Sequence, residues 1–298
     1  EYILLFIITF DVIRRVTGHS FFMKYRYPAM LHTMPKNLVI FGGFAIGLIL
    51  MVSIYGVLHA RRVYVRQDPV VIEKSSSLPG LKIALIADLH LGYNSTKSHV
   101  RKIVDTINSQ NVDLVCIAGD LFDNDYNAIK DPDEVADILS DIKSRYGTYA
   151  CWGNHDVSEK ILAGFTFPQK ETIVRDGRLT EFLHHAGITM LEDETVCINN
   201  AFYLVGRRDK DMAKKEQLPR KTFAEITEPL DPSLPIIVMD HQPGELSEAS
   251  DAGVDLDLSG HTHDGQMFPA NLVVHFLWEN ACGVLKKGAM TSIVTSGA

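Results

Sequence analysis

The residues of this sequence that could do chemistry are carboxylates, histidines and one asparagine, and each stands just after a short apolar run. They are Asp88, His90, Asp120, Asn154, His241, His261 and His263. The apolar runs are typical of buried strands in an open α/β sheet, where ligands bind outside the carboxyl ends of the strands. We therefore expect all seven side chains to gather at one edge of the sheet.

The spacing of these residues suits the coordination of two metal ions. Residues i and i+2 of an extended chain point to the same side, so Asp88 and His90 can face one ion, and His261 and His263 one site. Carboxylate, imidazole and amide oxygen together suit Mn, Fe or Zn rather than Ca. A single carboxylate can bridge two ions about 3.5–4 Å apart, the separation that two-metal phosphatases use. The residue types thus predict a site for two metal ions.

The elements that must position these residues alternate between strand and helix. Short apolar runs predict buried strands over residues 81–87, 113–118, 148–152, 235–239 and 254–258. Helical spacing predicts helices over residues 98–109, 132–144 and 178–186. This order is typical of an α/β fold whose first strands are parallel. A strand is also expected ahead of them, over residues 63–74. A second sheet is expected to contain the short runs 188–191, 195–198 and 202–205.

An uncharged apolar run over residues 38–58 is long enough to cross a membrane. It has about 20 residues, the length that a bilayer core requires. The alternative is a buried core helix of a soluble protein; a signal peptide is disfavoured because no small-residue cleavage site follows. Five basic residues precede the run and three follow it, which favours the preceding loop in the cytoplasm and the remainder on the extracytoplasmic side of a bacterial membrane.

We therefore expect a membrane region over residues 1–66 and a larger domain over residues 67–298. The membrane region would comprise a partial span over residues 1–10, a basic loop over residues 11–37 and a transmembrane helix over residues 38–59. Because the chain stops just after an apolar run, the larger domain is expected to be truncated at its C-terminus.

Charge divides along the same boundary. The whole chain carries a formal charge of −8; residues 1–66 have eight Lys/Arg against two acidic residues, a net of +6, which leaves −14 for the remainder. A domain this acidic lacks the positive surface that nonspecific nucleic-acid binding requires, so no nucleic-acid partner is expected. The four cysteines form no C-x-x-C pair and predict neither a disulfide framework nor a zinc knuckle.

The ordered elements D-x-H, G-D, G-N-H-D, H and G-H-T-H resemble the calcineurin-like metallophosphoesterase superfamily, and within it the membrane-associated bacterial YkuE-like group. The resemblance covers residues 61–298 and includes ALIADLHLG, YACWGNHD and LSGHTHDGQMFP. It implies a four-layer αββα sandwich, preceded here by transmembrane helices. It also implies two divalent or trivalent ions (Mn, Fe or Zn, with Mn favoured).

The same resemblance assigns roles to the residues. It implies a first ion held by Asp88, His90, Asp120 and His263. It implies a second ion held by Asp120, Asn154, His241 and His261. In the family, a metal-bridging hydroxide attacks phosphorus in line. His155 would then protonate the leaving alkoxide, and Asp156 would orient that imidazole through a hydrogen bond.

Some charged residues near these motifs have less specific expectations. Asp264 stands where relatives carry Gly or Asn and is expected to face water. Arg207 and Arg208 could hold a substrate phosphate, but a surface pair is the favoured interpretation. Asp123 is expected to cap or support the loop after Asp120.

The function predicted from these observations is hydrolysis of a phosphomonoester, phosphodiester or pyrophosphate bond by a membrane-anchored enzyme. Location beside lipid headgroups makes a lipid-linked phosphate a candidate substrate alongside phosphorylated small molecules. The alternative is a non-catalytic metal-binding scaffold or regulatory membrane protein on the same fold, against which the complete ligand set and His155 count. A lactamase-type metallohydrolase is disfavoured because no H-x-H-x-D-H cluster occurs early in the chain. The oligomeric state is left open.

Overall fold

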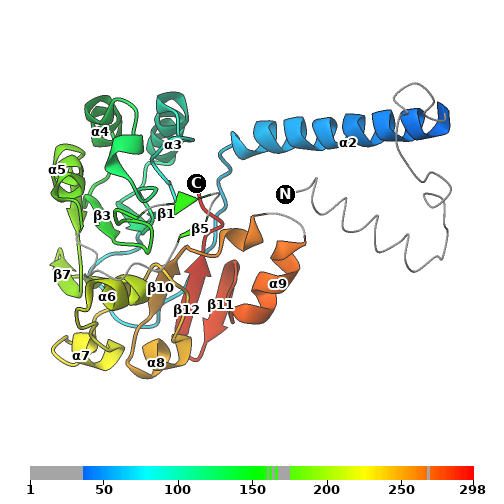
Figure 1. Cartoon of the computed structure of the whole chain (residues 1–298). Helices are drawn as coiled ribbons and strands as arrows, with labels where there is room; N and C mark the ends of the chain where they lie inside the picture. The colour runs from blue at the N-terminus through cyan, green and yellow to red at the C-terminus, as the bar shows by residue number, and fades with distance from the viewer. Residues whose placement is uncertain (1–35, 160, 163–164, 167–174, 267–268) are drawn as a thin grey trace. The chain divides into compact units, whose positions relative to one another are not determined.

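The structure is a computed structural model that describes residues 36–159, 161–162, 165–166, 175–266 and 269–298. The chain divides into two compact units, residues 1–62 and residues 63–298. The first unit contains helix α2 (Lys36–Ala60), and the second contains all the other described elements (Figure 1). The partial span expected over residues 1–10, and most of the basic loop, lie outside the described residues.

Helix α2 is apolar around its whole circumference. Large side chains on different sides of it, among them Phe44, Leu50 and Val52, are exposed. From Gly42 to Ala60 the helix is long and apolar enough to cross a membrane. A helix that is apolar on all sides is either buried in protein or in lipid. Its exposure therefore indicates membrane association.

The first sheet of the second unit contains four strands in the order β1-β2-β3-β6. These are β1 (Ile83–Ile86), β2 (Leu114–Ala118), β3 (Thr148–Cys151) and β6 (Ile188–Met190), and every neighbouring pair is parallel. Parallel neighbours need a crossover connection. Those connections contain the helices α3 (Lys97–Ser109), α4 (Pro132–Ser140) and α5 (Gly177–His185).

These helices form because one face of each is apolar and their first turns suit a helix N-terminus. In α3, the Thr96 side chain accepts a hydrogen bond from the His99 amide, and Val100, Ile103, Val104 and Ile107 are buried. In α4, a proline occupies the first turn, where its missing N–H costs nothing. The buried residues of the three helices pack with the outward face of the sheet in one hydrophobic core.

The second sheet has six strands in the order β11-β12-β10-β9-β8-β7. They are β7 (Glu194–Ile198), β8 (Phe202–Gly206), β9 (Ile236–Met239), β10 (Leu256–Ser259), β11 (Gly283–Lys287) and β12 (Met290–Val294). The central pairs are parallel, and the two edge strands β7 and β11 are antiparallel to their neighbours.

The two sheets pack against each other through a shared apolar core. Leu114 and Cys116 of the first sheet are buried in one cluster with Leu204, Met239 and Leu258 of the second. The far face of the second sheet is covered by α7 (Phe223–Thr227) and α8 (Leu246–Asp251). This arrangement confirms the predicted four-layer αββα sandwich. The remaining elements are η1 (Tyr126–Ala128), β4 (Ile161–Leu162), β5 (Phe165–Thr166), α6 (Lys210–Glu216), η2 (His263–Gly265) and α9 (Ala270–Leu277).

Three predictions of secondary structure are wrong. Residues 63–74 form no strand, although Val70 and Ile72 pack on the core between the sheets, and apolar alternation alone cannot supply a pairing partner. Residues 188–191 join the first sheet rather than the second, because α5 provides the crossover that a parallel neighbour of β3 requires. Helix α4 ends at Ser140, short of the predicted residue 144.

Candidate metal centre

The loops that leave β1, β2, β3, β9 and β10 converge at the carboxyl ends of the strands. Backbone hydrogen bonds join neighbouring loops: the Asp88 amide donates to the Gly119 carbonyl at 3.1 Å, and the His90 amide to the Asp120 carbonyl at 3.0 Å. In the second sheet the Gly260 amide donates to the His241 carbonyl at 3.0 Å. These bonds fix the loops that carry the predicted ligands.

Three predicted ligands form a first group. The ligand atoms of Asp88, His90 and His263 lie within 4.8 Å of one another. His90 Nε2 and His263 Nε2 are 3.2 Å apart, and His263 Nε2 is 3.8 Å from Asp88 Oδ1. Their side chains are buried or half-buried, so the group is recessed below the protein surface.

Asp120, His241 and His261 form a second group with the same spacing. His241 Nε2 lies 3.1 Å from Asp120 Oδ2, and His261 Nδ1 lies 3.2 Å from His241 Nε2. Asn154 adds its amide oxygen, 3.0 Å from His241 Nε2. Asp120 Oδ2 is also 3.9 Å from His90 Nε2 of the first group. One carboxylate oxygen therefore faces both groups, as a bridging ligand would.

The protonation of the histidines fits lone-pair donation to a cation. Burial lowers the pKa of both His261 and His263 to about 4, so both imidazoles are neutral at pH 7. The His241 ring places Nδ1 2.8 Å from the Ala118 carbonyl, which leaves Nε2 directed at the site. Two imidazole nitrogens about 3.2 Å apart in each group need a proton or a metal ion between them.

The buried carboxylates also call for positive charge. Burial raises the pKa of Asp88 to about 7. Burial disfavours the charged form of His241, yet the neighbouring Asp120 carboxylate raises the pKa of His241 well above its usual value. Without a metal ion, Asp88 and His241 therefore tend to hold protons, and metal binding would release them. Mixed carboxylate, imidazole and amide donors fit Mn, Fe or Zn.

Five of the ligand residues have a left-handed backbone. Their φ angles are +58° at Asp88, +42° at His90, +51° at Asp120, +71° at His261 and +51° at His263. Non-glycine residues seldom adopt this conformation, and each such residue costs of order 1–3 kcal/mol. The sharp turns direct successive side chains into the site, so the strand ends are shaped for ligation at the expense of backbone stability.

Glycines allow the loops to approach each other closely. A Cβ on Gly153 would collide with the carboxylate and the amide of Asp120. Gly119 has a φ of +81°, and a Cβ there would stand 2.5 Å from the His241 ring. A larger residue at either position would displace a predicted ligand.

His155 lies beside the two groups, but its expected partnership with Asp156 is wrong. The fully buried Asp156 carboxylate accepts hydrogen bonds from the amides of Asp120, Phe122 and Gly153 at 2.7–3.1 Å and so ties two ligand loops together. The imidazole instead has Asn124 as its partner, with Nδ2 of Asn124 2.5 Å from Nδ1 of His155. The His155 amide donates to Asp120 Oδ1 at 2.8 Å.

Arg207 and Arg208 are not a surface pair. Arg207 is 2% exposed; its Nη1 lies 2.9 Å from Asp240 Oδ2 and 3.1 Å from Glu245 Oε2. Arg220 pairs with the same two carboxylates at 2.6 and 2.9 Å. Asp240 immediately precedes His241, so this buried network supports a predicted ligand from behind.

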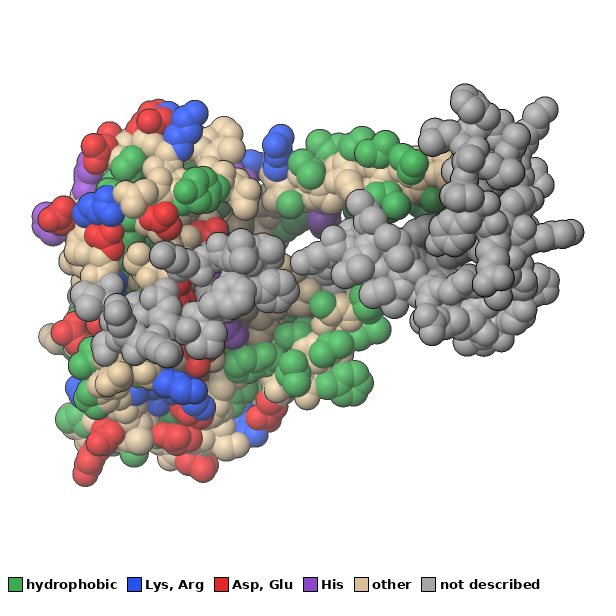
Figure 2. All heavy atoms as spheres, in the orientation of Figure 1, with side chains coloured by type: hydrophobic (Ala, Val, Ile, Leu, Met, Phe, Trp, Pro, Cys, Tyr) green, Lys and Arg blue, Asp and Glu red, His purple; other side chains and the backbone are tan. Residues whose placement is uncertain are grey.

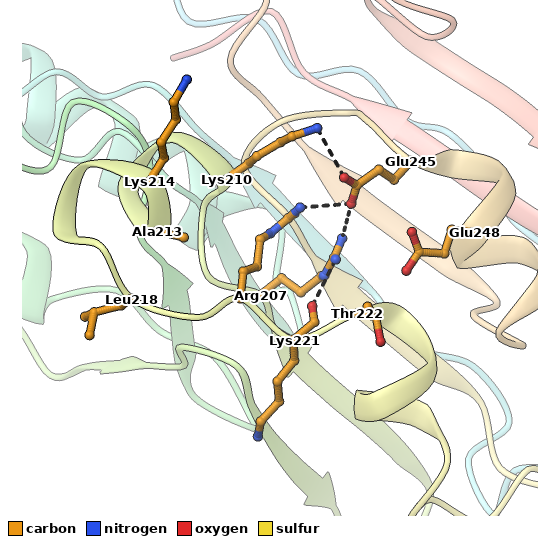
Figure 3. Close-up of a pocket in the computed structure, with 10 residues that line it drawn as sticks. Arg207, Lys210, Ala213, Lys214, Leu218, Lys221, Thr222, Glu245 and Glu248 are labelled. Atoms are coloured by element: carbon orange, nitrogen blue, oxygen red, sulfur yellow. Dashed lines mark hydrogen bonds and ion pairs between the residues drawn. The ribbon is translucent and has the colours of Figure 1, made fainter. Parts of the chain in front are cut away.

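The same network lines a cavity of about 290 Å³ (Figure 3). Its cationic groups are committed to internal partners: Arg207, Arg220 and Lys210 all contact Glu245, whereas Lys214 points away. Because these cations already have partners, they offer a substrate phosphate few free donors.

The other residues singled out in the sequence lie close to the site without joining either group. Asp123 Oδ1 is 3.8 Å from His90 Nδ1, on the side of the ring away from Asp120. The Asp264 side chain is 45% exposed, as expected, but its Oδ1 also lies 3.0 Å from His275 Nε2 in α9.

Comparison with known proteins identifies the family. The Calcineurin-like phosphoesterase family model matches residues 81–265. An uncharacterized metallophosphoesterase of Helicobacter pylori is 32% identical over 236 residues, which cover 78% of this chain and 58% of that protein. A transmembrane protein with metallophosphoesterase domain from Danio rerio is 27% identical over 269 residues, 83% of this chain and 55% of that protein. The chain thus spans little more than half the length of these relatives.

A more distant relative has a named activity. The UDP-2,3-diacylglucosamine pyrophosphatase LpxG of Chlamydia trachomatis is 22% identical over 228 residues, 65% of this chain and 67% of that protein. The matched residues 81–265 include every predicted ligand and His155. The chain belongs to the calcineurin-like phosphoesterase family.

Proposed function

We propose that this protein is a membrane-anchored phosphoesterase that uses two metal ions to hydrolyse a phosphate ester or pyrophosphate. The observation that carries the proposal is the position of Asp120 Oδ2, 3.1 Å from His241 Nε2 and 3.9 Å from His90 Nε2. A carboxylate oxygen that faces two groups of imidazoles is the arrangement that two adjacent cations require.

The first ion would be held by Asp88, His90, Asp120 and His263. The second would be held by Asp120, Asn154, His241 and His261. Divalent or trivalent ions, with Mn favoured, would lower the pKa of water toward neutrality and stabilise charge on the phosphoryl oxygens. Asp156 would keep the β2 and β3 loops in register through its three amide hydrogen bonds, so that Asp120 and Asn154 stay directed at one point.

His155 would donate a proton to the leaving oxygen. The Asn124 side-chain N–H directed at Nδ1 makes that nitrogen the acceptor, which leaves the proton on Nε2, the atom that must give it up. The imidazole lies next to the ligand groups, with its ring centroid 5.3 Å from that of His90. We therefore propose that Asn124, rather than Asp156, orients the His155 imidazole.

A lipid-linked substrate is supported by two observations. The apolar helix α2 precedes the catalytic unit by only two residues, and relatives include transmembrane proteins. The name of the LpxG relative specifies a pyrophosphatase of a diacylated nucleotide sugar. We propose that the site takes phosphate or pyrophosphate esters on lipid headgroups, on the extracytoplasmic side of the membrane.

The test is turnover of bis-p-nitrophenyl phosphate and p-nitrophenyl phosphate by the full chain in mild detergent, with Mn²⁺ and with chelator. Asn154→Ala is expected to lower the bound metal per chain. His155→Ala should keep the metal but lose about 10²–10⁴-fold in kcat, the usual contribution of a general acid. His184→Ala, an exposed histidine in α5, is the matched control.

Metal-dependent turnover that is lost with chelator and in both site variants would support the hydrolase. Bound metal without turnover of any ester would favour the alternative of a metal-binding scaffold. Absence of both metal binding and turnover would refute the proposed centre.

A further inference from the structure

Helix α9 exposes an apolar face next to the candidate metal centre. Phe276 is 90% exposed and Leu277 74%, and Leu272 and Val273 are more than half exposed. Residues four apart lie on the same side of a helix, so Leu272 stacks with Phe276, and Val273 with Leu277, in one stripe. Figure 2 shows these apolar side chains as a patch over α9. Single exposed apolar residues are common, whereas a contiguous patch of this kind marks an interaction surface.

The opposite side of α9 is attached to the metal centre. His275 Nε2 is 3.0 Å from Asp264 Oδ1, and Asp264 directly follows the predicted ligand His263. At the C-terminal end of the helix, the Trp278 ring also lies with its centroid 5.3 Å from that of His261. The apolar stripe therefore has a fixed position beside the candidate metal centre.

Within the second unit, its first residues pass close to the segment that leaves α9. Arg66 is six residues beyond the end of α2, and its Nη1 lies 3.2 Å from the point where a Cβ on Gly283 would stand. Gly283 is six residues beyond the end of α9 and opens β11, next to the turn that the buried Asn280 side chain fastens to β12 through Ser292. The start of the second unit at Arg66 thus lies close to the chain that leaves α9.

We propose that α9 docks on the surface of a lipid bilayer, with Leu272, Val273, Phe276 and Leu277 inserted at the boundary between headgroups and acyl chains. The bilayer is favoured over a protein partner because α2 of the same chain keeps it permanently within reach, at a high effective concentration. The stripe contains no charged residue that would specify a protein partner, and its Phe and Leu side chains are of the kind that interfacial helices insert. The inference requires anchoring by α2 but not hydrolysis.

The test uses the full chain in phosphatidylcholine vesicles, with and without phosphatidylglycerol. Phe276→Cys is labelled with the NBD (nitrobenzoxadiazole) fluorophore. In the background chain, the accessible Cys197 and Cys282 are replaced by serine, and the buried Cys116 and Cys151 are kept. The matched control labels Ser140→Cys, an exposed position at the end of α4, which lies across the catalytic unit from α9 in Figure 1. Because Phe276 makes little contact with the domain, its replacement should not impair folding.

The expected result is a blue shift of the emission at position 276 and a loss of intensity with nitroxide-labelled lipids, and neither change at position 140. A water-exposed spectrum at position 276 in both kinds of vesicle would overturn the proposal. A blue shift that is insensitive to nitroxide lipids and disappears when the vesicles hold one chain each would also overturn it, in favour of contact with a second copy of the chain. No outcome depends on catalytic activity, so failure here is distinguishable from failure of the proposed function.

Discussion

Asp257 offers a direct test of the electrostatics of the second sheet. Its carboxyl lies inside β10, fully buried, and accepts hydrogen bonds from Ser292 Oγ at 2.8 Å and Ser259 Oγ at 3.2 Å. Burial raises its pKa from 3.8 to about 7, with the nearby Asp240 carboxylate adding to the shift. The folded protein therefore holds a proton at pH values where the unfolded chain has released it.

The sign of the effect on stability follows from that proton. Between about pH 4 and pH 7 the folded state binds more protons than the unfolded state, so stability falls as the pH rises. A shift of about three pKa units corresponds to about 4 kcal/mol of unfolding free energy above pH 7. Asp257→Asn keeps the shape and can still bond both serines, but it has no proton to lose. We expect the variant to match the wild type near pH 4 and to exceed it by about 4 kcal/mol near pH 8.

The assay is urea unfolding of both chains in mild detergent and chelator at a series of pH values, followed by tryptophan fluorescence. Comparing two chains at each pH cancels the titration that both share. Asp176→Asn is the matched control: Arg178 lowers the pKa of that partly exposed carboxyl, so the difference in stability between this variant and the wild type should change with pH only in acid. Parallel stability curves for the wild type and Asp257→Asn from pH 4 to pH 8 would refute the reasoning.

Three other predictions concern the metal centre and its support. Gly153→Ala should reduce bound metal per chain, measured by elemental analysis, because its Cβ collides with the ligand carboxylate behind it. Asn124→Ala should lower kcat about 10–100-fold and shift the alkaline limb of the pH–rate profile, because His155 loses the partner that fixes its tautomer. Arg207→Met should lower the unfolding free energy by about 3 kcal/mol in urea, because Asp240 loses one of its buried partners.

Each of these has an outcome that would contradict it. Full metal content in Gly153→Ala would mean that the loops can separate without harm; Gly177→Ala, where a Cβ meets nothing within 4 Å, is its control. An unchanged pH–rate profile in Asn124→Ala would mean that Asn124 does not orient His155 for catalysis and has only a structural role. Unaltered stability in Arg207→Met would show that Arg220 alone compensates the carboxylate.

The positions of most strands, and the gathering of the predicted ligands at the strand ends, could be read from the sequence because both depend on local patterns. Buried parallel strands appear as short apolar runs, and D-x-H or G-H-T-H directly follows its strand, so no long-range contact is needed to find it. The αββα architecture came from the family resemblance and is confirmed. The left-handed backbone at the ligands was not predicted, since nothing in their residue types requires it.

The errors arose where a contact between distant segments decides the outcome. Asn124 reaches His155 across 31 positions, and the adjacent Asp156 seemed the better partner only because it was nearer in sequence. Arg207 follows a strand like many surface residues, but carboxylates from two other loops make its burial possible. Helix α9 does have a local signal, an apolar stretch directly after the last ligands, which could have been noticed.

At the ligand residues with left-handed backbone, selection for stability and selection for metal binding favour different amino acids. Glycine or asparagine adopts positive φ at lower cost than aspartate or histidine, so replacing Asp88 or His261 in this way relieves backbone strain. A library evolved for thermostability alone should therefore accumulate glycine and asparagine at these turns and lose its metal ions as it does so. A library kept under selection for turnover should retain the strained residues and gain its stability elsewhere in the fold.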